Sequence, residues 1–174
     1  MAQTSTGFTL PHPSERLKKD MYDDAAIPGI ENKMAFRQTQ DVPGYWMTLD
    51  MNSFRDINAV HGHALGDSVI KAVGTAISQT ILQSPYAKKA RGFRAGGDNF
   101  AVWAETPEAL PYLLRQIHTR MDQIPLIGGT HKVSIGAGMG RTVDEANQSL
   151  AQAKTTKNTT LGPHAIGHVT HSTL

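Results

Sequence analysis

The sequence predicts a single α/β (α+β) sandwich, in which helices pack on the faces of one β-sheet. Short apolar runs bounded by turn residues alternate with longer segments that carry apolar residues at helical spacing. Their order is strand, helix, hairpin, helix, strand, helix, which places helices against a sheet. A chain of 174 residues builds one hydrophobic core and leaves little room for a second.

Composition narrows the class of protein. Hydrophobic residues make up 39% and charged residues 18% of the chain, as in globular and not in disordered proteins. The net charge of +2 gives no reason to expect nucleic acid or a membrane as partner. The absence of cysteine excludes disulfides and thiolate chemistry. Without an export signal or an apolar run of about 20 residues, we expect a cytoplasmic protein.

The N-terminal part contains few apolar residues. We expect residues 1–22 to form a polar leader, with a short helix over 15–24 before a turn. A second helix is predicted over 32–40. The folded domain is expected to cover residues 23–160, and residues 161–174 are expected to form a C-terminal tail or an edge strand.

The central part predicts a strand, a helix and a hairpin. Residues 45–49 form a short apolar and aromatic run typical of a buried strand. Apolar residues recur at helical spacing over 65–81, which indicates an amphipathic helix. Residues 88–105 carry two apolar arms around Gly96-Gly97-Asp98, which is typical of a hairpin.

The C-terminal half predicts two further helices and a strand. Residues 107–124 form an amphipathic helix and residues 132–138 a strand. A last helix is predicted over 142–154. Thr142 and Glu145 have the spacing of a capping box at its start.

Two acidic residues indicate a candidate metal site. Asp50 ends the first strand, and Asp98 follows two glycines at the hairpin tip. Carboxylates on neighbouring strands suit Mg²⁺, and glycines let a phosphate approach the backbone. Taken singly, each feature has another explanation, because a Gly-Gly-Asp tip is a common turn and an aspartate often caps a helix.

Longer blocks of sequence surround both aspartates. Residues 50–58 read Asp-Met-Asn-Ser-Phe-Arg-Asp-Ile-Asn, residues 62–67 supply Gly-His and Gly-Asp, and residues 94–100 read Arg-Ala-Gly-Gly-Asp-Asn-Phe. They resemble the GGDEF family, whose pattern is Asp-x-Asp-x-Phe-Lys-x-x-Asn, Gly-His-x-x-Gly-Asp and Arg-x-Gly-Gly-Asp-Glu-Phe. The resemblance covers about residues 24–158, and dispersed blocks in order are more specific than the hairpin alone.

The resemblance implies a fold, a ligand and a reaction. The fold is nucleotidyl-cyclase-like, with a central, mostly antiparallel sheet flanked by helices. The ligand is GTP or another guanine nucleotide, held with Mg²⁺ or Mn²⁺. Family members condense two GTP molecules into cyclic di-GMP between two facing domains, so a homodimer is one expected partner and a separate regulatory protein another.

The resemblance also assigns roles to individual residues. Asp50 and Asp98 would hold the metal with the Met51 carbonyl, while Asn58 and Asp67 would read the guanine edge, as an amide and a carboxylate can. The other residues of the implied site each have two explanations or a supporting role. Lys154 and Arg55 would contact phosphate or remain solvated at the surface. Phe54 and His63 would lie at the nucleotide, although Phe54 is also explained by core packing and His63 by capping of a loop. Gly96 and Gly97 would lie beside the nucleotide.

Departures from the family pattern affect the expected activity. Asn99 replaces a glutamate used at the metals, and an amide cannot accept a proton from an attacking hydroxyl. Asn52 replaces the second aspartate of the first block. The Arg-x-x-Asp product-inhibition motif would fall on residues 87–90 and is absent, and the terminal motif is shortened over residues 153–158.

Three functions remain open. The first is a degenerate domain that binds GTP with Mg²⁺ and has weak or no cyclase activity, so that Asp98, Asn99 and Lys154 form a reduced catalytic set. The second is an active diguanylate cyclase that tolerates Asn99. The third is a protein-interaction module with a vestigial nucleotide pocket, against which the intact pair Asn58 and Asp67 argues.

Overall fold

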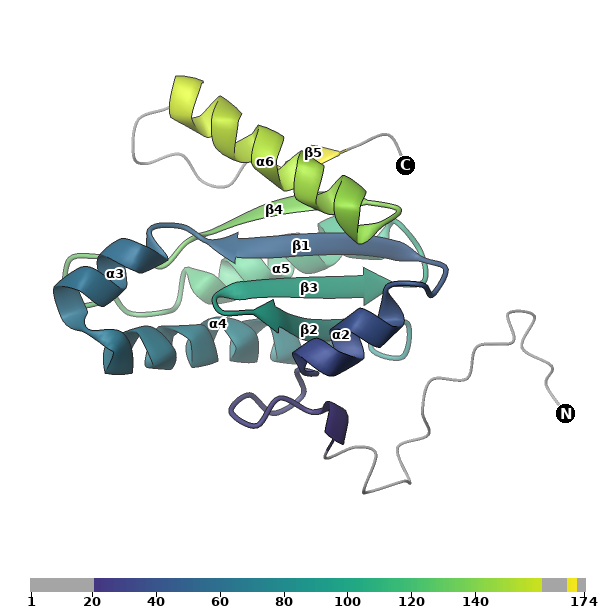
Figure 1. Cartoon of the computed structure of the whole chain (residues 1–174), viewed down its shortest axis with the longest axis horizontal. Coiled ribbons are helices and arrows are strands. Elements are labelled where there is room, and N and C mark those ends of the chain that lie inside the picture. The colour runs from purple at the N-terminus through teal and green to yellow at the C-terminus, as the bar shows by residue number, and fades with distance from the viewer. Residues whose placement is uncertain (1–20, 161–168, 172–174) are drawn as a thin grey trace, which may run out of the picture.

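The computed structural model describes residues 21–160 and 169–171, and its centre is one five-stranded sheet (Figure 1). The strand order is β2-β3-β1-β4-β5. Every pairing is antiparallel except the parallel pair of β4 and β5. The mostly antiparallel sheet is therefore confirmed. Its strands are β1 (Tyr45–Met51), β2 (Ala90–Gly96), β3 (Asn99–Ala104), β4 (Ile135–Gly140) and β5 (Val169–His171).

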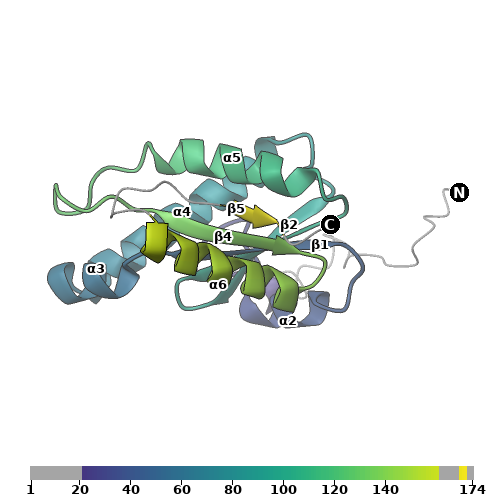
Figure 2. The same cartoon turned by 90° about the horizontal axis from the view of Figure 1, so that it is seen from above.

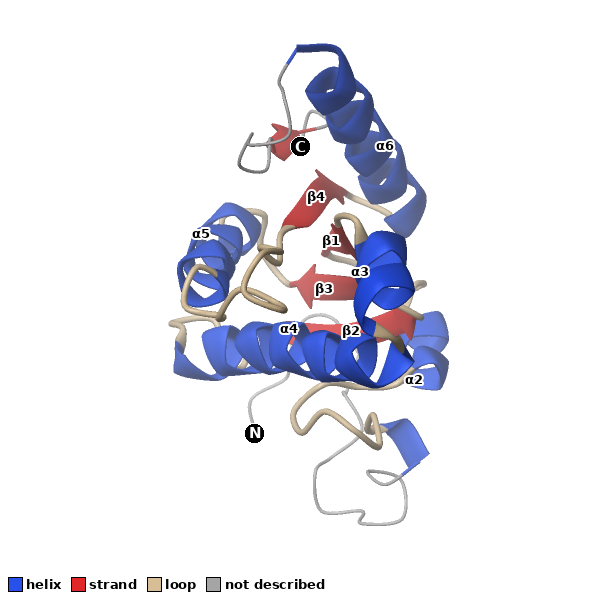
Figure 3. Cartoon of the chain, turned by 90° about the vertical axis from the view of Figure 1, so that its left-hand side faces the viewer, coloured by secondary structure: helices blue, strands red, loops and turns tan. Residues whose placement is uncertain are grey.

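Helices cover both faces of the sheet (Figure 2). Helices α4 and α5 pack on one face, and α2 and α6 on the other, which confirms the sandwich. Viewed from the end at which α3 lies, α3 stands beside the ends of β1 and β3 (Figure 3). The helices are α2 (Lys33–Thr39), α3 (Phe54–His61), α4 (His63–Gln83), α5 (Ala109–Met121) and α6 (Val143–Thr160).

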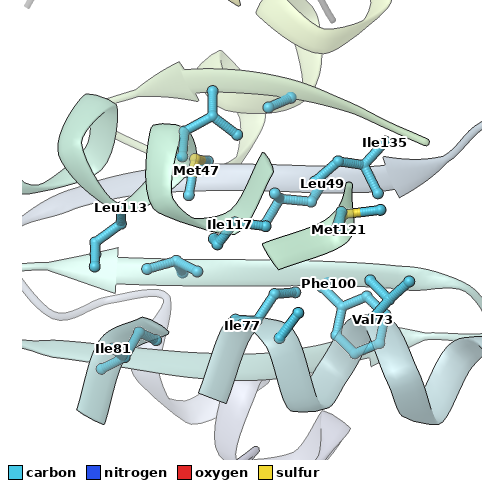
Figure 4. Packing of buried hydrophobic residues seen from close by; sticks show 14 of the residues in the cluster. Met47, Leu49, Val73, Ile77, Ile81, Phe100, Leu113, Ile117, Met121 and Ile135 are labelled. Carbon is cyan, nitrogen blue, oxygen red and sulfur yellow. The ribbon is translucent and has the colours of Figure 1, made fainter. Parts of the chain in front are cut away.

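The main core lies between the sheet and the pair α4 and α5 (Figure 4). Alternate residues of β1, such as Met47 and Leu49, face this layer because side chains alternate along a strand. They meet Val73 and Ile77 of α4 and Ile117 of α5. The predicted apolar faces of both helices are therefore confirmed.

The opposite face of the sheet carries a second, aromatic cluster. Trp46 of β1 lies with its ring centre 5.7 Å from that of Phe36 of α2 and also 5.7 Å from that of Phe93 of β2. Helix α6 approaches β4 closely at Gly138, where an added Cβ would lie 2.2 Å from the Ala146 carbonyl oxygen. Glycine at this position therefore sets how tightly α6 packs on the sheet.

Two predicted helix starts are confirmed by their caps. The Asn32 side chain accepts hydrogen bonds from the backbone N–H groups of Met34 and Ala35. At α6 the Glu145 N–H donates to Thr142 Oγ1, while the Glu145 carboxylate accepts from the Arg141 N–H. The second bond lies one residue earlier than in the standard capping box.

Three elements differ from the prediction. Helix α3 was not predicted, because its eight residues are too few for a helical repeat to be read from the sequence and only Ile57 among them is buried. The strand predicted over 132–138 is β4, Ile135–Gly140, since residues before Ile135 lack ladder pairing. The helix predicted over 15–24 lies mostly outside the described residues, and Asp23 pairs with Glu31 in an isolated bridge.

Within residues 21–160 and 169–171, no helix combines the length and apolarity needed to cross a membrane.

Candidate nucleotide and metal site

A cleft of about 760 Å³ opens where β1 ends, between helix α3 and the turn that joins β2 to β3. Its wall combines carboxylates, amides, one guanidinium, one imidazole and one phenyl ring. Most of the residues predicted from sequence to form the site therefore share one cavity. The residues that line it are Asp50, Met51, Ser53, Phe54, Arg55, Asn58, Ala59, His63, Asp98 and Asn99.

Four predicted residues are not part of this lining. Asp67 is exposed on the second turn of α4, so the structure does not bring the expected carboxylate partner of Asn58 into the cleft wall. Gly96 ends β2, and Gly97 precedes Asp98 in the turn of the hairpin. Lys154 of α6 reaches the site indirectly, through an ion pair.

The ion pair joins Lys154 to Asp50. Side chains alternate along a strand, and Asp50 lies four residues after Trp46 on β1. Its side chain therefore points to the same face as Trp46, which α6 covers. There the Lys154 Nζ donates to Asp50 Oδ2, with both side chains partly exposed. The lysine ammonium therefore occupies a position on the carboxylate that a metal cation would also seek.

The β2–β3 turn brings Asp98 to the end of β1. Gly97 has φ +55°, a left-handed conformation that favours glycine, and its carbonyl accepts a hydrogen bond from Arg94 Nε at 3.0 Å. Asn99, the first residue of β3, is the register partner of Asp50. Pairing of β1 with β3 thus sets Asp98 and Asn99 beside Asp50.

Helix α3 directs its N-terminus at the cleft. The backbone φ angle of Ser53, which precedes the helix, is +57°. Within the described ranges, no other non-glycine residue has a positive φ angle. The Ser53 side chain makes no capping hydrogen bond, so the first N–H groups of α3 can bind an anion. Sequence reasoning missed Ser53 and Ala59 as lining residues, and the available signal was that Ser53 lies inside the first block and Ala59 directly follows it.

Asn58 is the part-buried amide of the cleft. Its Oδ1 is buried and, among the described residues, has no hydrogen-bond partner. A Cβ at Gly66 would lie 1.9 Å from this oxygen and 3.3 Å from the Phe54 ring. The glycine of the second block thus leaves room on α4 for the side chains of α3. Phe54 serves both expected roles, since it packs against the core and lines the cleft.

The resemblance to the GGDEF family implies that Asn58 binds guanine. On that expectation, replacing Gly66 with alanine should weaken binding of a guanine nucleotide about tenfold, because the new methyl group would displace the Asn58 amide. Calorimetric titration with GTP measures the change. Ser68→Ala, an exposed position on the same helix outside the cleft, serves as the control and should bind as the parent does. Equal affinity of both variants would show that Asn58 does not contact the base.

The contacts of Asn52 and His63 differ from those expected of the corresponding residues in the family pattern. Asn52, in the second acidic position of the first block, donates from Nδ2 to Ser134 Oγ at 3.0 Å and does not line the cleft. His63 is exposed at the cleft, and across residues 21–160 no hydrogen bond engages its side chain. The loop-capping explanation of His63 therefore has no support from these contacts.

Two side chains with shifted pKa values, His118 and Asp122, lie away from the cleft. Burial lowers the pKa of His118 on α5, against a smaller opposite effect of the Asp122 carboxylate. The hydrogen bond and the charge of Lys132, whose Nζ lies 2.8 Å from Asp122 Oδ1, lower the pKa of that exposed carboxyl. These groups lie at the end of α5, so their titration reports on that end of the helix.

The donor set of the cleft fits a hard divalent cation. Asp50 and Asp98 supply carboxylate oxygens, and Met51, whose side chain lies in the core, lines the same wall, where its backbone carbonyl would be a further oxygen ligand. Mg²⁺ is typically held by one or two carboxylates and completes its shell with water and phosphate oxygens. No sulfur or imidazole ligand is needed for such a site.

Comparison with known proteins places the chain in a family. Residues 28–160 match the family model described as "Diguanylate cyclase, GGDEF domain". The chain therefore belongs to the GGDEF domain family.

The chain also resembles individual members. It is 30% identical over 124 residues to the probable diguanylate cyclase DgcI of Escherichia coli (strain K12), covering 64% of this chain and 27% of that protein. It is 32% identical over 73 residues to the diguanylate cyclase DgcS of Shewanella oneidensis (strain MR-1), covering 42% and 23%. The chain spans only 15% to 27% of the length of the curated relatives it matches.

Solved structures show the same fold at low identity. The coiled coil and GGDEF domain of DgcB from Caulobacter crescentus, in complex with c-di-GMP, matches with a TM-score of 0.62 and 17% identity, covering 90% of this chain and 89% of that chain. Diguanylate cyclase SiaD from Pseudomonas aeruginosa, in complex with its activator SiaC, matches with a TM-score of 0.64 and 19% identity, covering 90% and 64%.

Proposed function

We propose that this chain is a degenerate GGDEF domain that binds GTP with Mg²⁺, cyclises it weakly or not at all, and acts in cyclic di-GMP-related signalling. One observation carries the proposal. Asp50, Asp98 and Asn58, which come from a strand, a hairpin turn and a helix, line a single cleft together with the exposed Asn99.

The metal and phosphate end of the cleft supports nucleotide binding. Members of this family use divalent metal ions, and the two carboxylates would hold one while bound phosphate completes its shell. The uncapped N-terminus of α3 and the Arg55 guanidinium supply hydrogen-bond donors for phosphate oxygens. These groups hold and orient a nucleotide without requiring its turnover.

The guanine end rests on Asn58. Its unpartnered buried oxygen would accept from the N1 or N2 donors of guanine, or its nitrogen would donate to O6. Asp67 would complete the reading pair from α4 if the bound base extends beyond the cleft wall. The proposal therefore predicts that Asn58 contributes more to guanine binding than Asp67.

Asn99 is the residue that argues against efficient catalysis. It stands where the family pattern has glutamate, and its neutral amide neither accepts the proton of an attacking hydroxyl nor holds a metal strongly. The presence of both aspartates in the cleft favours a second candidate, an active diguanylate cyclase that tolerates Asn99. In that case metal binding and orientation would supply most of the rate.

One experiment separates these candidates. The pure chain is incubated with GTP and Mg²⁺ or Mn²⁺ at a concentration high enough to favour dimers, products are separated by chromatography, and GTP binding is titrated by calorimetry. Binding without product supports the degenerate domain, and cyclic di-GMP supports the cyclase. Absence of both would contradict the proposal and favour a protein-interaction module.

Replacing Lys154 with glutamine is expected to tighten Mn²⁺ binding to the nucleotide-free chain about three- to tenfold, because the ammonium competes with the metal for Asp50. The same change should weaken GTP binding, since a cation near the phosphates is lost. Electron paramagnetic resonance of free Mn²⁺ measures the first effect.

The control for this variant is Lys132→Gln, which removes an exposed lysine that pairs with Asp122 outside the cleft. It should leave Mn²⁺ affinity unchanged. Weaker Mn²⁺ binding in Lys154→Gln would mean that Lys154 positions Asp50 for the metal and does not compete with it.

A further inference from the structure

A second cleft adjoins the first on the face of the sheet that α2 and α6 cover. Its volume is about 380 Å³, and Phe36 of α2 with Val143 and Leu150 of α6 gives it apolar walls. Asn99 lines both clefts, so the two cavities meet at this residue. A molecule that passes Asn99 would have one part in each cleft.

The second cleft is lined by two exposed polar side chains, Asp144 and Asn147, and by the buried hydroxyl of Thr48. Asp144 and Asn147 lie three residues apart on α6, so their side chains share a face of the helix. Across the described part of the chain, no hydrogen bond or ion pair engages either side chain. Thr48 of β1 is only 5% exposed, and its buried Oγ1 also has no partner among those residues.

The residues that line this cleft favour an uncharged part of a ligand. Asp144 is the single charged residue in its lining, which includes no lysine, arginine or histidine. Phosphate would meet a carboxylate and no cation, so the cleft disfavours the charged part of a nucleotide. Apolar walls with a few directed polar groups instead suit a base and its sugar.

We infer that this cleft is a second subsite for a guanine nucleoside. A carboxylate accepts from the adjacent N1–H and N2–H groups of guanine, and an amide nitrogen donates to O6, so Asp144 and Asn147 match one edge of the base. The Thr48 hydroxyl would find a partner in the same ligand. Cytosine and uracil do not offer this pattern of two adjacent donors beside an acceptor.

The contact between the clefts extends the inference to a linear dinucleotide of two guanosines. One base would lie at Asn58 and the other at Asp144 and Asn147, with the phosphodiester beside Asn99. The neutral amide of Asn99 can donate to a phosphate oxygen, whereas a carboxylate there would repel it. Placement of the first base rests on the proposed function, while the second subsite does not.

The test uses the whole chain with Mg²⁺ and two probes, GMP and the linear dinucleotide pGpG. Calorimetry should show pGpG binding about tenfold or more tightly than GMP, because its second base binds within the same molecule. Side-chain amide resonances of ¹⁵N-labelled chain should shift at Asn58 with GMP, and at both Asn58 and Asn147 with pGpG.

Variants assign the effect to the second cleft. Asn147→Leu and Asp144→Asn should each remove the advantage of pGpG and leave GMP affinity unchanged. Gln148→Ala, on the neighbouring exposed position outside the cleft, should keep the advantage. Far-ultraviolet circular dichroism verifies that each variant is folded.

Three results would overturn the inference while leaving the proposed function intact: equal affinity for the two probes, no shift at Asn147, or an advantage that survives both α6 variants. If GMP does not shift Asn58, the proposed function fails instead. Guanosine at millimolar concentration then decides the second subsite by itself, since a shift at Asn147 supports it and no shift refutes it.

Discussion

Replacing Asp98 with asparagine is expected to lower the Mg²⁺-dependent affinity for GTP about 10- to 100-fold and to abolish any cyclic di-GMP formed. Asp98 lies on the β2–β3 turn and is one of two carboxylates in the cleft. Asparagine keeps the size of the side chain and removes its charge. The remaining Asp50 is already paired with Lys154, so little negative charge would be left for a metal.

Calorimetric titrations with and without Mg²⁺ measure this effect. Asp41→Asn, an exposed aspartate outside the cleft, removes the same charge and should leave both affinities unchanged. Mg²⁺-dependent binding that survives in Asp98→Asn would show that the metal does not require the hairpin carboxylate, and the proposed site would be wrong.

Replacing Asn99 with glutamate is expected to raise the rate of cyclic di-GMP formation about 100-fold or more, from a rate near the limit of detection. Asn99 pairs in register with Asp50 and lines the cleft, so a carboxylate at this position would face the bound metal and nucleotide. It would add a metal ligand and a proton acceptor to a site that otherwise keeps Asp50, Asp98 and Asn58.

Asn99→Gln is the matched control, because it has the length of glutamate without the charge. It should remain as slow as the parent. A parent chain that already forms product as fast as Asn99→Glu would refute the degenerate reading and establish the active cyclase. An inactive Asn99→Glu variant that still binds GTP would locate the defect elsewhere, with Asn52 as the next position to restore.

The sequence predicted most of the fold because its signals are local. Helical periodicity identified α4 and α5, and the spacing of a capping box marked the start of α6. Helix α3 was missed because its eight residues span only about two turns, which is too short for its amphipathic pattern to be recognised. The start of β4 was misplaced because a strand begins where a neighbour pairs with it, which is not a property of its own residues.

Most candidate site residues were identified through the resemblance of sequence blocks to the GGDEF family, and the structure brings most of them to one cleft. Their roles remain predictions. The structure alone shows that Asp67 stays outside the cleft wall and that Asn52 bonds to Ser134. It also shows that Ser53 lines the cleft. Such facts depend on the direction of individual side chains, which spacing along the chain does not define.

The sequence by itself determined the fold class, the family pattern and the residue types available at the site, because periodicity and motif order are written along the chain. Only the tertiary structure decided which groups meet. Lys154 reaches Asp50 across 104 positions of sequence, and Asn99 lines two clefts whose other residues come from distant parts of the chain. Contacts of this kind follow from how helices pack on a sheet, and distant residues meet only when that packing is complete.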